Sequence, residues 1–368
     1  MSAGNTLPSI ADVAALAGVS TGTVSNVLNR PHVVAAPTRE RVDAAIASLG
    51  FVRNESARVL GSGSSRALGF VAMDVGNPFF TDIARAVQDV AEASGLVVLL
   101  ADSRESVEQE RANVELFAQQ RVRGVVITPA GDVTGALEML ARTGIPAVLV
   151  DPAAGGADHC SVATDDLTGG RLAVRHLLDL GHRRVAFVGG PARLHQVADR
   201  FRGAAEEVAD TAGAVLQRWD TDHLTIAAGR RAGADLLAKP IADRPTGIFA
   251  ANDLLALGIL HELLAAGCAV PGDVAVIGYD DIDLAATGLL PLSTVRQPRA
   301  EMGRQAAGLL LEEIGGDPRH RHRQLLFTPE VIVRASTTGT PATATMAPGG
   351  VTVAGPPGAS GPVAGAGR

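Results

Sequence analysis

The chain has 368 residues, of which 46% are hydrophobic and 19% are charged, and its mean hydropathy is +0.20. This apolar content excludes a disordered chain, a coiled coil and a small disulfide-held domain, and the length suggests two or three domains. Because the net charge is −7, any binding to nucleic acid has to come from a local patch.

The first 66 residues differ in charge from the rest. Six arginines against four acids give +2 there, which leaves −9 for residues 67–368. The N-terminus has no basic segment, and Asp12 interrupts its apolar residues, which is unlike a signal peptide. No apolar run reaches the roughly 18 residues of a membrane span. The two cysteines, Cys160 and Cys268, do not suggest a disulfide framework. A cytoplasmic protein is therefore expected.

Residues 10–29 predict two short helices joined by a turn at Gly18 and Val19. Ser20 or Thr21 is the expected cap of the second helix. The predicted inner faces are Ile10, Val13, Ala14, Leu16 and Ala17 in the first helix, and Val24, Val27 and Leu28 in the second. The small polar residues left outside can enter a major groove. Such faces are also often only solvated, so on these residues alone both interpretations stay open.

After a Gly/Ser-rich linker at 61–65, short apolar runs alternate with amphipathic helices from Ala67 to about Val333. This alternation predicts buried parallel strands in βαβ units. The runs are ALGFVAM, GLVVLLA, GVVITPA, IPAVLVD, RRVAFVGG, TGIFAAN and DVAVIGYD, and Gly95, Gly144, Gly181 and Gly267 lie where helices should end. Residues 339–368 hold eight glycines, five prolines and one charge, and are predicted to be a disordered tail.

Motifs for catalysis are missing from the sequence. No G-x-G-x-x-G follows a strand, and there is no Walker lysine motif, H-E-x-x-H or C-x-x-C. We interpret the basic runs at 182–185 and at 319–323, which includes His320 and His322, as solvated loop charges rather than metal ligands. No enzyme activity, cofactor or metal site is therefore expected.

The pattern A-D-V-A-x-L-A-G-V-S-x-x-T-V-S-x-V-L-N, followed by T-R-E-R-V-x-A-A-I-x-x-L-G-F, resembles the DNA-binding head of the LacI/GalR family of repressors. NESARVL resembles its hinge helix, and LGFVAMDVGNPFF, IFAANDLLALGIL, DVAVIGYDD and LSTVRQPRAEMG resemble its effector core. The resemblance implies a small all-α helix-turn-helix domain at 1–53, a hinge helix and linker at 54–66, and a two-lobed α/β periplasmic-binding-protein-like core with parallel sheets at 67–338.

The resemblance also implies roles for residues of the head. Thr21, Gly22 and Asn26 occupy base-reading positions, and Thr23, Ser25 and Asn29 occupy phosphate-contacting positions. Gly22 has no side chain that could contact a base, so base recognition is expected to depend mainly on Asn26. In the hinge, Arg58 is expected to meet phosphate, and Leu60 matches the wedge that enters the minor groove. Its spacing alone favours an ordinary apolar residue at the end of a surface helix.

For the core, the resemblance implies an effector pocket at the carboxyl ends of strands. Its expected members are Phe79, Phe80, Asp165, Arg200, Asn252 and Asp280. Carboxylates and Arg200 can bond vicinal hydroxyls while a phenyl ring covers an apolar face. Leu194 and Gln196 near Arg200 carry less charge than a phosphorylated or carboxylated ligand would need, which favours a neutral sugar or polyol over a purine. Phe79 and Phe80 can instead be core, and Asp165 a helix cap. Whether Trp219 or Leu224 lines the pocket stays open.

Together these features predict a homodimeric repressor of a pseudo-palindromic operator, with affinity set by a small molecule and with no membrane contact. The sign of that control stays open. The first alternative is a solute-binding protein for carbohydrate uptake, which would carry an exported N-terminus in place of the helix-turn-helix. The second is a small-molecule enzyme on the same scaffold.

Overall fold

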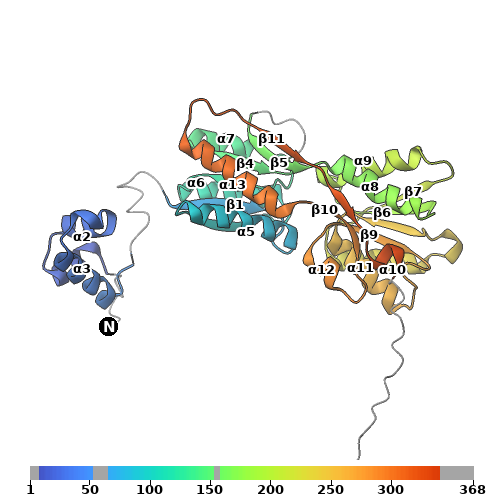
Figure 1. Cartoon of the computed structure of the whole chain (residues 1–368), viewed down its shortest axis with the longest axis horizontal. Coiled ribbons are helices and arrows are strands. Elements are labelled where there is room, and N and C mark those ends of the chain that lie inside the picture. The colour runs from blue at the N-terminus through green and yellow to red at the C-terminus, as the bar shows by residue number, and fades with distance from the viewer. Residues whose placement is uncertain (1–7, 53–64, 153–157, 340–368) are drawn as a thin grey trace, which may run out of the picture. The chain divides into compact units, whose positions relative to one another are not determined.

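The computed structural model describes residues 8–52, 65–152 and 158–339 (Figure 1). Within these residues, no helix combines the length and the apolar character that a bilayer crossing needs. The predicted tail at 340–368 and most of the predicted hinge, including Arg58 and Leu60, lie outside the described residues.

Three α-helices and a short 3-10 helix form the N-terminal head. They are α1 (Ile10–Ala17), α2 (Thr21–Asn29), η1 (Pro31–Val33) and α3 (Ala36–Leu49). A capping box between Ser9 and Asp12 starts α1, and Gly18 ends it in the left-handed conformation with φ 62°. Ser20, one of the two predicted caps, starts α2 by accepting a hydrogen bond from the Thr23 amide. The head is thus a helix-turn-helix unit, as the sequence predicted.

The predicted inner face of α1 is wrong at two positions. Val13, Ala14 and Ala17 are buried, but Ile10 and Leu16 are 36% and 55% exposed. Leu16 is rotated by about 100° from the buried face because each residue turns the helix by that angle. Ile10 has the correct rotation but is the first residue of the helix, beyond the neighbouring helices that pack on Val13.

After the head, the chain forms two compact units, each built on a six-stranded sheet. In unit 1 the strand order is β11-β5-β4-β3-β1-β2, and the pairs from β5 to β2 are parallel. Helix α5 packs against α13, and α6 packs against α7. The elements of unit 1 are β1 (Ala67–Ala72), α5 (Pro78–Ala93), β2 (Val97–Asp102), α6 (Val107–Gln119), β3 (Val125–Ile127), α7 (Thr134–Thr143), β4 (Ala147–Val150), β5 (Cys160–Thr164), α13 (Arg299–Gly315) and β11 (Gln324–Phe327).

Unit 2 repeats this design with the order β12-β10-β9-β8-β6-β7, in which only the β10–β12 pair is antiparallel. In Figure 1, α8 and α9 lie on one side of this sheet and α10 and α11 lie on the other. Its elements are α8 (Asp166–Asp179), β6 (Arg184–Val188), α9 (His195–Ala209), β7 (Val215–Trp219), α10 (Ile226–Ala238), η2 (Ile241–Asp243), β8 (Gly247–Ala250), α11 (Asp253–Ala265), β9 (Ala275–Asp280), α12 (Asp283–Thr287), β10 (Ser293–Arg296), β12 (Glu330–Ile332) and α14 (Ala335–Thr338).

All seven predicted apolar runs contain a strand, and all four glycines predicted to end helices have positive φ. One expectation of burial is wrong, because Val97, Leu99 and Leu100 of β2 are 40 to 52% exposed. The sequence pattern of β2 is that of a buried strand, but β2 forms the edge of its sheet and has a neighbour on one side only.

The chain passes between the two units three times, at 163–164, 298–299 and 326–327. Elements from distant parts of the sequence therefore complete each unit: α13 and β11 return to unit 1 after the chain has built most of unit 2. Contacts that combine early and late segments cannot be read from local sequence patterns.

Candidate functional site

The outer face of α2 carries the predicted DNA-contacting residues. Thr21, Gly22, Asn26 and Asn29 are exposed, and Thr23 and Ser25 are half-buried. The opposite face packs Val24 and Val27 into the head. The structure therefore places all six residues on one short helix with a small, polar outer surface, which is the shape a recognition helix needs.

Several of these side chains are already engaged within the head. The Thr23 hydroxyl lies 2.9 Å from the Ser20 hydroxyl, and Asn29 Nδ2 donates to the Ser25 carbonyl at 2.9 Å. The side-chain amide of Asn26, by contrast, makes no hydrogen bond with the part of the chain that the structure describes. A Cβ at Gly22 would meet only Ser20 Oγ at 3.6 Å, so packing does not require glycine there.

The basic excess of the N-terminal segment is not located in the described head. Within residues 8–52, the exposed arginines Arg30, Arg39 and Arg41 are matched in number by Asp12, Glu40 and Asp43. The excess of +2 therefore comes from residues 53–66, which contain Arg53, Arg58 and Arg66 against Glu55. We expect the hinge rather than the head to supply most of the electrostatic attraction to phosphate.

A charged network surrounds Arg200 in unit 2. Arg200 is 3% exposed, and its Nε donates to Asp166 Oδ1 at 2.8 Å. Its Nη1 donates to the Ala251 carbonyl at 2.7 Å and lies 3.9 Å from Asp280 Oδ1. The guanidinium carbon stacks 3.7 Å above the ring of the fully buried Tyr279. Burial opposes the charge, but the two carboxylates raise the pKa of Arg200, so the network keeps a fixed cation.

Two glycines allow this network to form. A Cβ at Gly170 in α8 would overlap the Arg200 backbone carbonyl, and a Cβ at Gly203 in α9 would overlap the Leu167 carbonyl. Because both positions are glycine, α8 and α9 approach closely enough for Arg200 to reach Asp166 at the start of α8. The position of Arg200 thus depends on a helix–helix contact that the sequence motif does not reveal.

The end of β9 has unusual backbone geometry. Asp280 has φ 110° and Asp281 has φ 55°, a region that non-glycine residues rarely adopt. Gln297 Nε2 donates to Asp280 Oδ1 at 2.8 Å, while Asp281 accepts from Arg296 and Arg334 at 2.7 and 2.6 Å. Burial opposes ionisation of Asp281, but the hydrogen bonds from these two arginines lower its pKa. Strained backbone of this kind is concentrated at functional sites.

Two predicted effector residues serve as helix caps. Asp165 Oδ1 accepts from the Thr168 amide at 3.0 Å at the start of α8. Asn252 Oδ1 accepts from the Leu255 amide at 2.9 Å at the start of α11, and its Nδ2 donates to the Leu224 carbonyl at 3.1 Å. The cap, which the sequence analysis gave as an alternative for Asp165, is therefore observed for both. Any contact with a ligand would be a second role.

Asp253 holds the loop after β9 in place. It is completely buried, and it accepts from the Thr294 hydroxyl at 2.6 Å and the Ile282 amide at 2.9 Å. Burial, together with the charge of Asp280, raises the pKa of Asp253 well above its usual value. Its two protein partners account for both of its oxygens, so it positions the loop that carries Asp280.

Phe79 and Phe80 lie in the first turn of α5 in unit 1. They are 2% and 5% exposed and pack edge to face, with ring centroids 5.1 Å apart. Asn77 caps this helix by accepting from the Phe79 amide at 3.0 Å. The six predicted effector residues are thus divided, with two phenyl rings on unit 1 and the polar groups Asp165, Arg200, Asn252 and Asp280 on unit 2.

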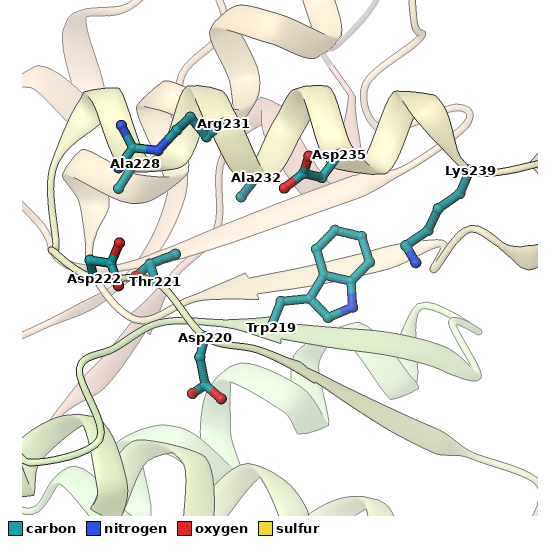
Figure 2. A pocket seen from close by; sticks show the side chains of 9 residues that line it. All are labelled: Trp219, Asp220, Thr221, Asp222, Ala228, Arg231, Ala232, Asp235 and Lys239. Atoms are coloured by element: carbon teal, nitrogen blue, oxygen red, sulfur yellow. The ribbon is translucent and has the colours of Figure 1, made fainter.

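Trp219 lines a pocket of about 460 Å³ within unit 2. Figure 2 shows its indole facing α10 near Asp235, with Lys239 at the far end; the Lys239 amino group is 5.1 Å from the ring centre. This pocket contains none of the six predicted effector residues. Leu224 does not line it: its side chain is buried and its carbonyl bonds Asn252.

The sequence reasoning missed two residues of the Arg200 network. Asp166 is its direct ion-pair partner, and the adjacent acids at 165–166 were the available signal. Gln297 is 1% exposed, and its Oε1 is buried without a hydrogen bond partner in the described chain. A buried amide oxygen without a donor is costly unless a ligand or water supplies one. No sequence signal identified it.

One prediction about charge is wrong in unit 1. His320 is not a solvated loop charge, because its side chain is only 14% exposed and lies 3.3 Å from the buried Cys160 thiol. Arg319 in the same run is exposed, as expected. The loop brings His320 against Cys160 of the sheet, while His322 stays 39% exposed.

Comparisons with known proteins agree with this architecture. Residues 9–54 match the bacterial regulatory proteins of the lacI family, and residues 174–337 match the periplasmic binding protein-like domain. The chain is 36% identical over 313 residues to the ribose operon repressor of Bacillus subtilis, covering 85% of this chain and 93% of the relative. It is 30% identical over 333 residues to the repressor PurR of Photobacterium profundum, covering 90% of this chain and 98% of that one.

A solved structure of the lac repressor dimer, bound to operator and the anti-inducer ONPF, superposes with a TM-score of 0.75 at 28% identity, over 90% of this chain and 99% of that one. The family regulates transcription and does not catalyse reactions, which confirms the expectation of a non-enzyme and decides against an uptake protein. With the head, the two sheets and these relatives in agreement, the chain belongs to the LacI family of bacterial transcriptional regulators.

Proposed function

We propose that this regulator is a repressor that binds a pseudo-palindromic operator as a homodimer, with affinity controlled by a neutral sugar or related polyol. The proposed division of the chain is a head at 1–53, a hinge helix and linker at 54–66, an effector and dimerisation core at 67–338, and a tail at 339–368. The relatives that support a repressor are the ribose operon repressor and PurR.

In the head, Asn26 is proposed as the principal base reader, with Thr21 and Gly22 beside it. Its exposed amide has no partner within the described head, and an amide can bond an adenine bidentately. Thr23, Ser25 and Asn29 would contact phosphates. Arg58 would contact a phosphate, and Leu60 would insert into the minor groove as a wedge.

The observation that carries the effector proposal is the charged network in unit 2, in which acids outnumber the one cation. Arg200 is fixed between Asp166 and Asp280, and the Gln297 amide, whose Oε1 has no hydrogen bond partner within the described residues, donates to Asp280. Carboxylates and an amide oxygen accept hydrogen bonds from hydroxyl groups, whereas they would repel a carboxylated or phosphorylated ligand. Asp165 and Asn252 would add polar contacts in unit 2, and Phe79 and Phe80 of unit 1 stay predicted members of the effector site.

Sugar-bound relatives agree with this choice. A complex of the regulator CelR with cellobiose superposes with a TM-score of 0.66 at 32% identity, covering 89% of this chain and 99% of that one. A LacI family regulator from Enterococcus faecium with bound ribose superposes with a TM-score of 0.67 at 30% identity, covering 75% of this chain and all of that one.

The edge strand β2 supports the homodimer. Val97, Leu99 and Leu100 are exposed on it, and an exposed apolar edge strand favours association with a second chain. Leu99→Glu should shift the protein toward monomers in sedimentation velocity, whereas Leu116→Glu on the exposed face of α6 should not. Identical behaviour of the two variants would remove β2 from the interface.

The decisive test selects duplexes from a random DNA pool on the purified full chain. The selection is repeated with ribose, cellobiose and a purine base in separate arms. A palindromic consensus whose recovery changes with one sugar is the expected result. Recovery that responds only to the purine would replace the sugar proposal, and no enrichment in any arm would refute the DNA-reading proposal itself.

Single variants then test which residues contact DNA and which contact the effector. Asn26→Ala should relax selection at one position of each half-site, and Leu60→Ala should lower operator affinity while sparing nonspecific binding. Gln297→Ala should weaken the effector response by about 5- to 150-fold, because a buried acceptor contributes roughly 1–3 kcal/mol. Gln305→Ala, an exposed glutamine on α13, is the matched control. An equal response of the two glutamine variants would exclude Gln297 from the pocket.

A further inference from the structure

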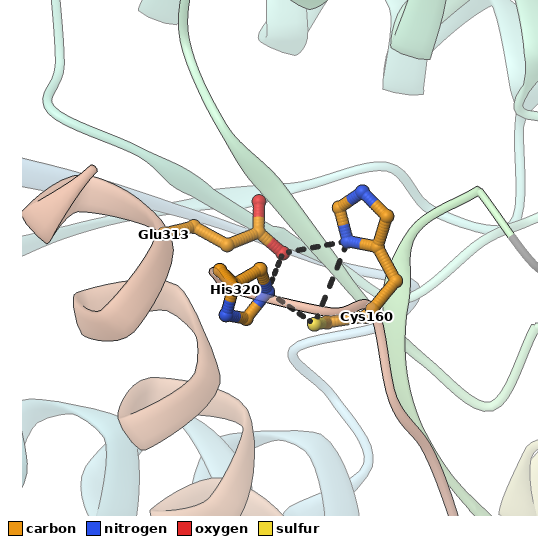
Figure 3. A group of neighbouring side chains, drawn as sticks. Cys160, Glu313 and His320 are labelled. Atoms are coloured by element: carbon orange, nitrogen blue, oxygen red, sulfur yellow. Dashed lines mark hydrogen bonds and ion pairs between the residues drawn. The ribbon is translucent and has the colours of Figure 1, made fainter. Parts of the chain in front are cut away.

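Four potential metal ligands come together in unit 1, whereas the network around Arg200 belongs to unit 2. Cys160 is the first residue of β5, Glu313 lies in the last turn of α13, and His320 and His322 lie in the connection between α13 and β11. Figure 3 shows the side chains of Cys160, Glu313 and His320 pointing toward one another. One ligand atom from each of the four residues lies within 4.8 Å of the other three.

The separations fit a single tetrahedral ion. Cys160 Sγ lies 3.3 Å from His320 Nε2 and 3.7 Å from His322 Nδ1. Glu313 Oε1 lies 3.7 Å from His320 Nε2 and 3.4 Å from His322 Nδ1. Metal–ligand bonds of about 2.0 to 2.3 Å at tetrahedral angles place neighbouring ligand atoms about 3.3 to 3.7 Å apart. Four of the six distances between ligand atoms lie in that range, and all six are within 4.8 Å.

Glu313 gives an independent indication of a missing partner. Its side chain is 10% exposed and Oε1 is buried, yet this oxygen makes no hydrogen bond within the described chain. It points between the two imidazole nitrogens instead. A carboxylate buried in this way is costly unless a positive group neutralises it.

The surroundings orient the ligands as in known metal sites. His320 presents Nε2 to the cluster while its Nδ1 faces Glu312 Oε2 at 3.6 Å, and Arg323 in turn contacts Glu312. The Arg323 amide donates to Cys160 Sγ at 3.5 Å. The second nitrogen of His320 thus faces a carboxylate, the type of group to which the second nitrogen of a zinc-bound histidine usually donates.

We propose that Cys160, Glu313, His320 and His322 form a binding site for one Zn²⁺ ion per chain. Thiolate and imidazole ligands select a borderline-soft cation over Mg²⁺ or Ca²⁺, and the carboxylate favours Zn²⁺ over Cu⁺. Four protein ligands leave no open position, so the ion is structural rather than catalytic. His322 is 39% exposed and provides the route by which the ion enters. This proposal departs from the sequence expectation of no metal site.

The bound ion would join three elements that lead toward unit 2. Strand β5 ends at the passage at 163–164, α13 starts at the passage at 298–299, and β11 ends at the passage at 326–327. Fixing these elements to one another stabilises the fold of unit 1, since an ion that binds only the folded state raises its stability.

The test uses full-length protein without a histidine tag, stripped of metal by a chelator. Addition of Zn²⁺ in calorimetry should show one site per chain and raise the melting temperature. Addition of Co²⁺ should give the thiolate-to-cobalt charge-transfer band and the intense visible bands of four-coordinate cobalt. His322→Ala, an exposed position that should not disturb folding, should weaken Zn²⁺ binding by at least about 10-fold. Cys160→Ser should abolish the charge-transfer band.

Two neighbouring variants serve as controls. Cys268→Ser changes the other cysteine, which lies in unit 2, and His159→Asn changes a histidine next to the cluster that is not one of the four ligands. Both should bind like the unmodified protein. The proposal is overturned if Co²⁺ binds without a thiolate band, if His322→Ala and His159→Asn bind equally well, or if Zn²⁺ leaves the melting temperature unchanged.

Discussion

The two units have the same sheet design but differ in how the charge of a buried acid is compensated. In unit 2, Arg200 pairs with Asp166 and lies 3.9 Å from Asp280, so one cation partly compensates two acids. In unit 1, Glu110 is 1% exposed and accepts a hydrogen bond from the Ala130 amide at 2.8 Å, but it forms no ion pair with any residue that the structure describes. Burial, opposed by that hydrogen bond and assisted by the charge of Asp132, raises the pKa of Glu110 to about 7.

This difference determines whether a buried acid stays charged or changes its charge near neutral pH. Around Arg200, unit 2 keeps permanent charges because acids and cation lie close together, so it can present a fixed polar surface to a ligand. Its Asp253 differs, because it forms no ion pair within the described residues and burial raises its pKa. Unit 1 has a buried carboxyl that is neutral in acid and becomes charged near neutrality. We therefore expect Glu110 to make the stability of unit 1 depend on pH between 4.5 and 7.

Removing the central cation of unit 2 should have the largest effect. Arg200→Ala leaves Asp166 and Asp280 buried and uncompensated, so we expect a loss of about 3–5 kcal/mol in the free energy of unfolding. Urea denaturation at neutral pH measures it. The control is Arg202→Ala on the same helix, whose ion pair with Asp199 is largely exposed and should contribute no more than about 1 kcal/mol. Equal losses of unfolding free energy in the two variants would show that Arg200 does not stabilise the buried acids as a network.

The pH dependence of unit 1 is tested by replacing Glu110 with a side chain that cannot ionise. Its pKa rises from 4.5 to about 7 on folding, so the proton stabilises the folded state. That stabilisation is complete below pH 4.5 and lost as pH rises through 7, a loss of about 3 kcal/mol. Glu110→Gln keeps the acceptor for Ala130 and should therefore be more stable than the parent by about that amount at roughly pH 8.5. Below about pH 4 the two should be alike.

Urea unfolding over a series of pH values gives this comparison. Glu115→Gln lies on the same helix but is exposed, and its curve should follow that of the parent at every pH. If Glu110→Gln also follows the parent, the contrast between the units disappears.

A smaller effect is expected from the caps of unit 2. Asn252→Ala removes the cap of α11 and also the donor to the Leu224 carbonyl, so we expect a loss of about 2 kcal/mol. Thr225→Ala removes only a cap, that of α10, and should cost about 1 kcal/mol. Thermal melts of both variants measure the difference. A Thr225 variant that loses as much as the Asn252 variant would mean that the bond to Leu224 contributes nothing.

Particular residues show how far local sequence patterns reach. The turn at Gly18, the cap at Ser20 and the strand runs were predictable because each depends on neighbours within a few residues. The exposure of β2 was not, because the sequence of a strand does not tell whether it has a neighbour on both sides. Asp166 was also missed, since its partner Arg200 belongs to another helix and is brought near by the close packing of α8 and α9 at Gly170 and Gly203.

The sequence by itself determined the family, the helix-turn-helix, the alternation of strands and helices and the residue types of the proposed sites. Only the tertiary structure decided which of these residues meet: that Cys160 lies beside His320, that Arg200 bonds Asp166, and that Trp219 faces α10. The physical reason is that periodicity and capping act over one or two turns, whereas the first two of these contacts close loops of 160 and 34 residues. Such closures are fixed by the packing of whole elements, which no short motif encodes.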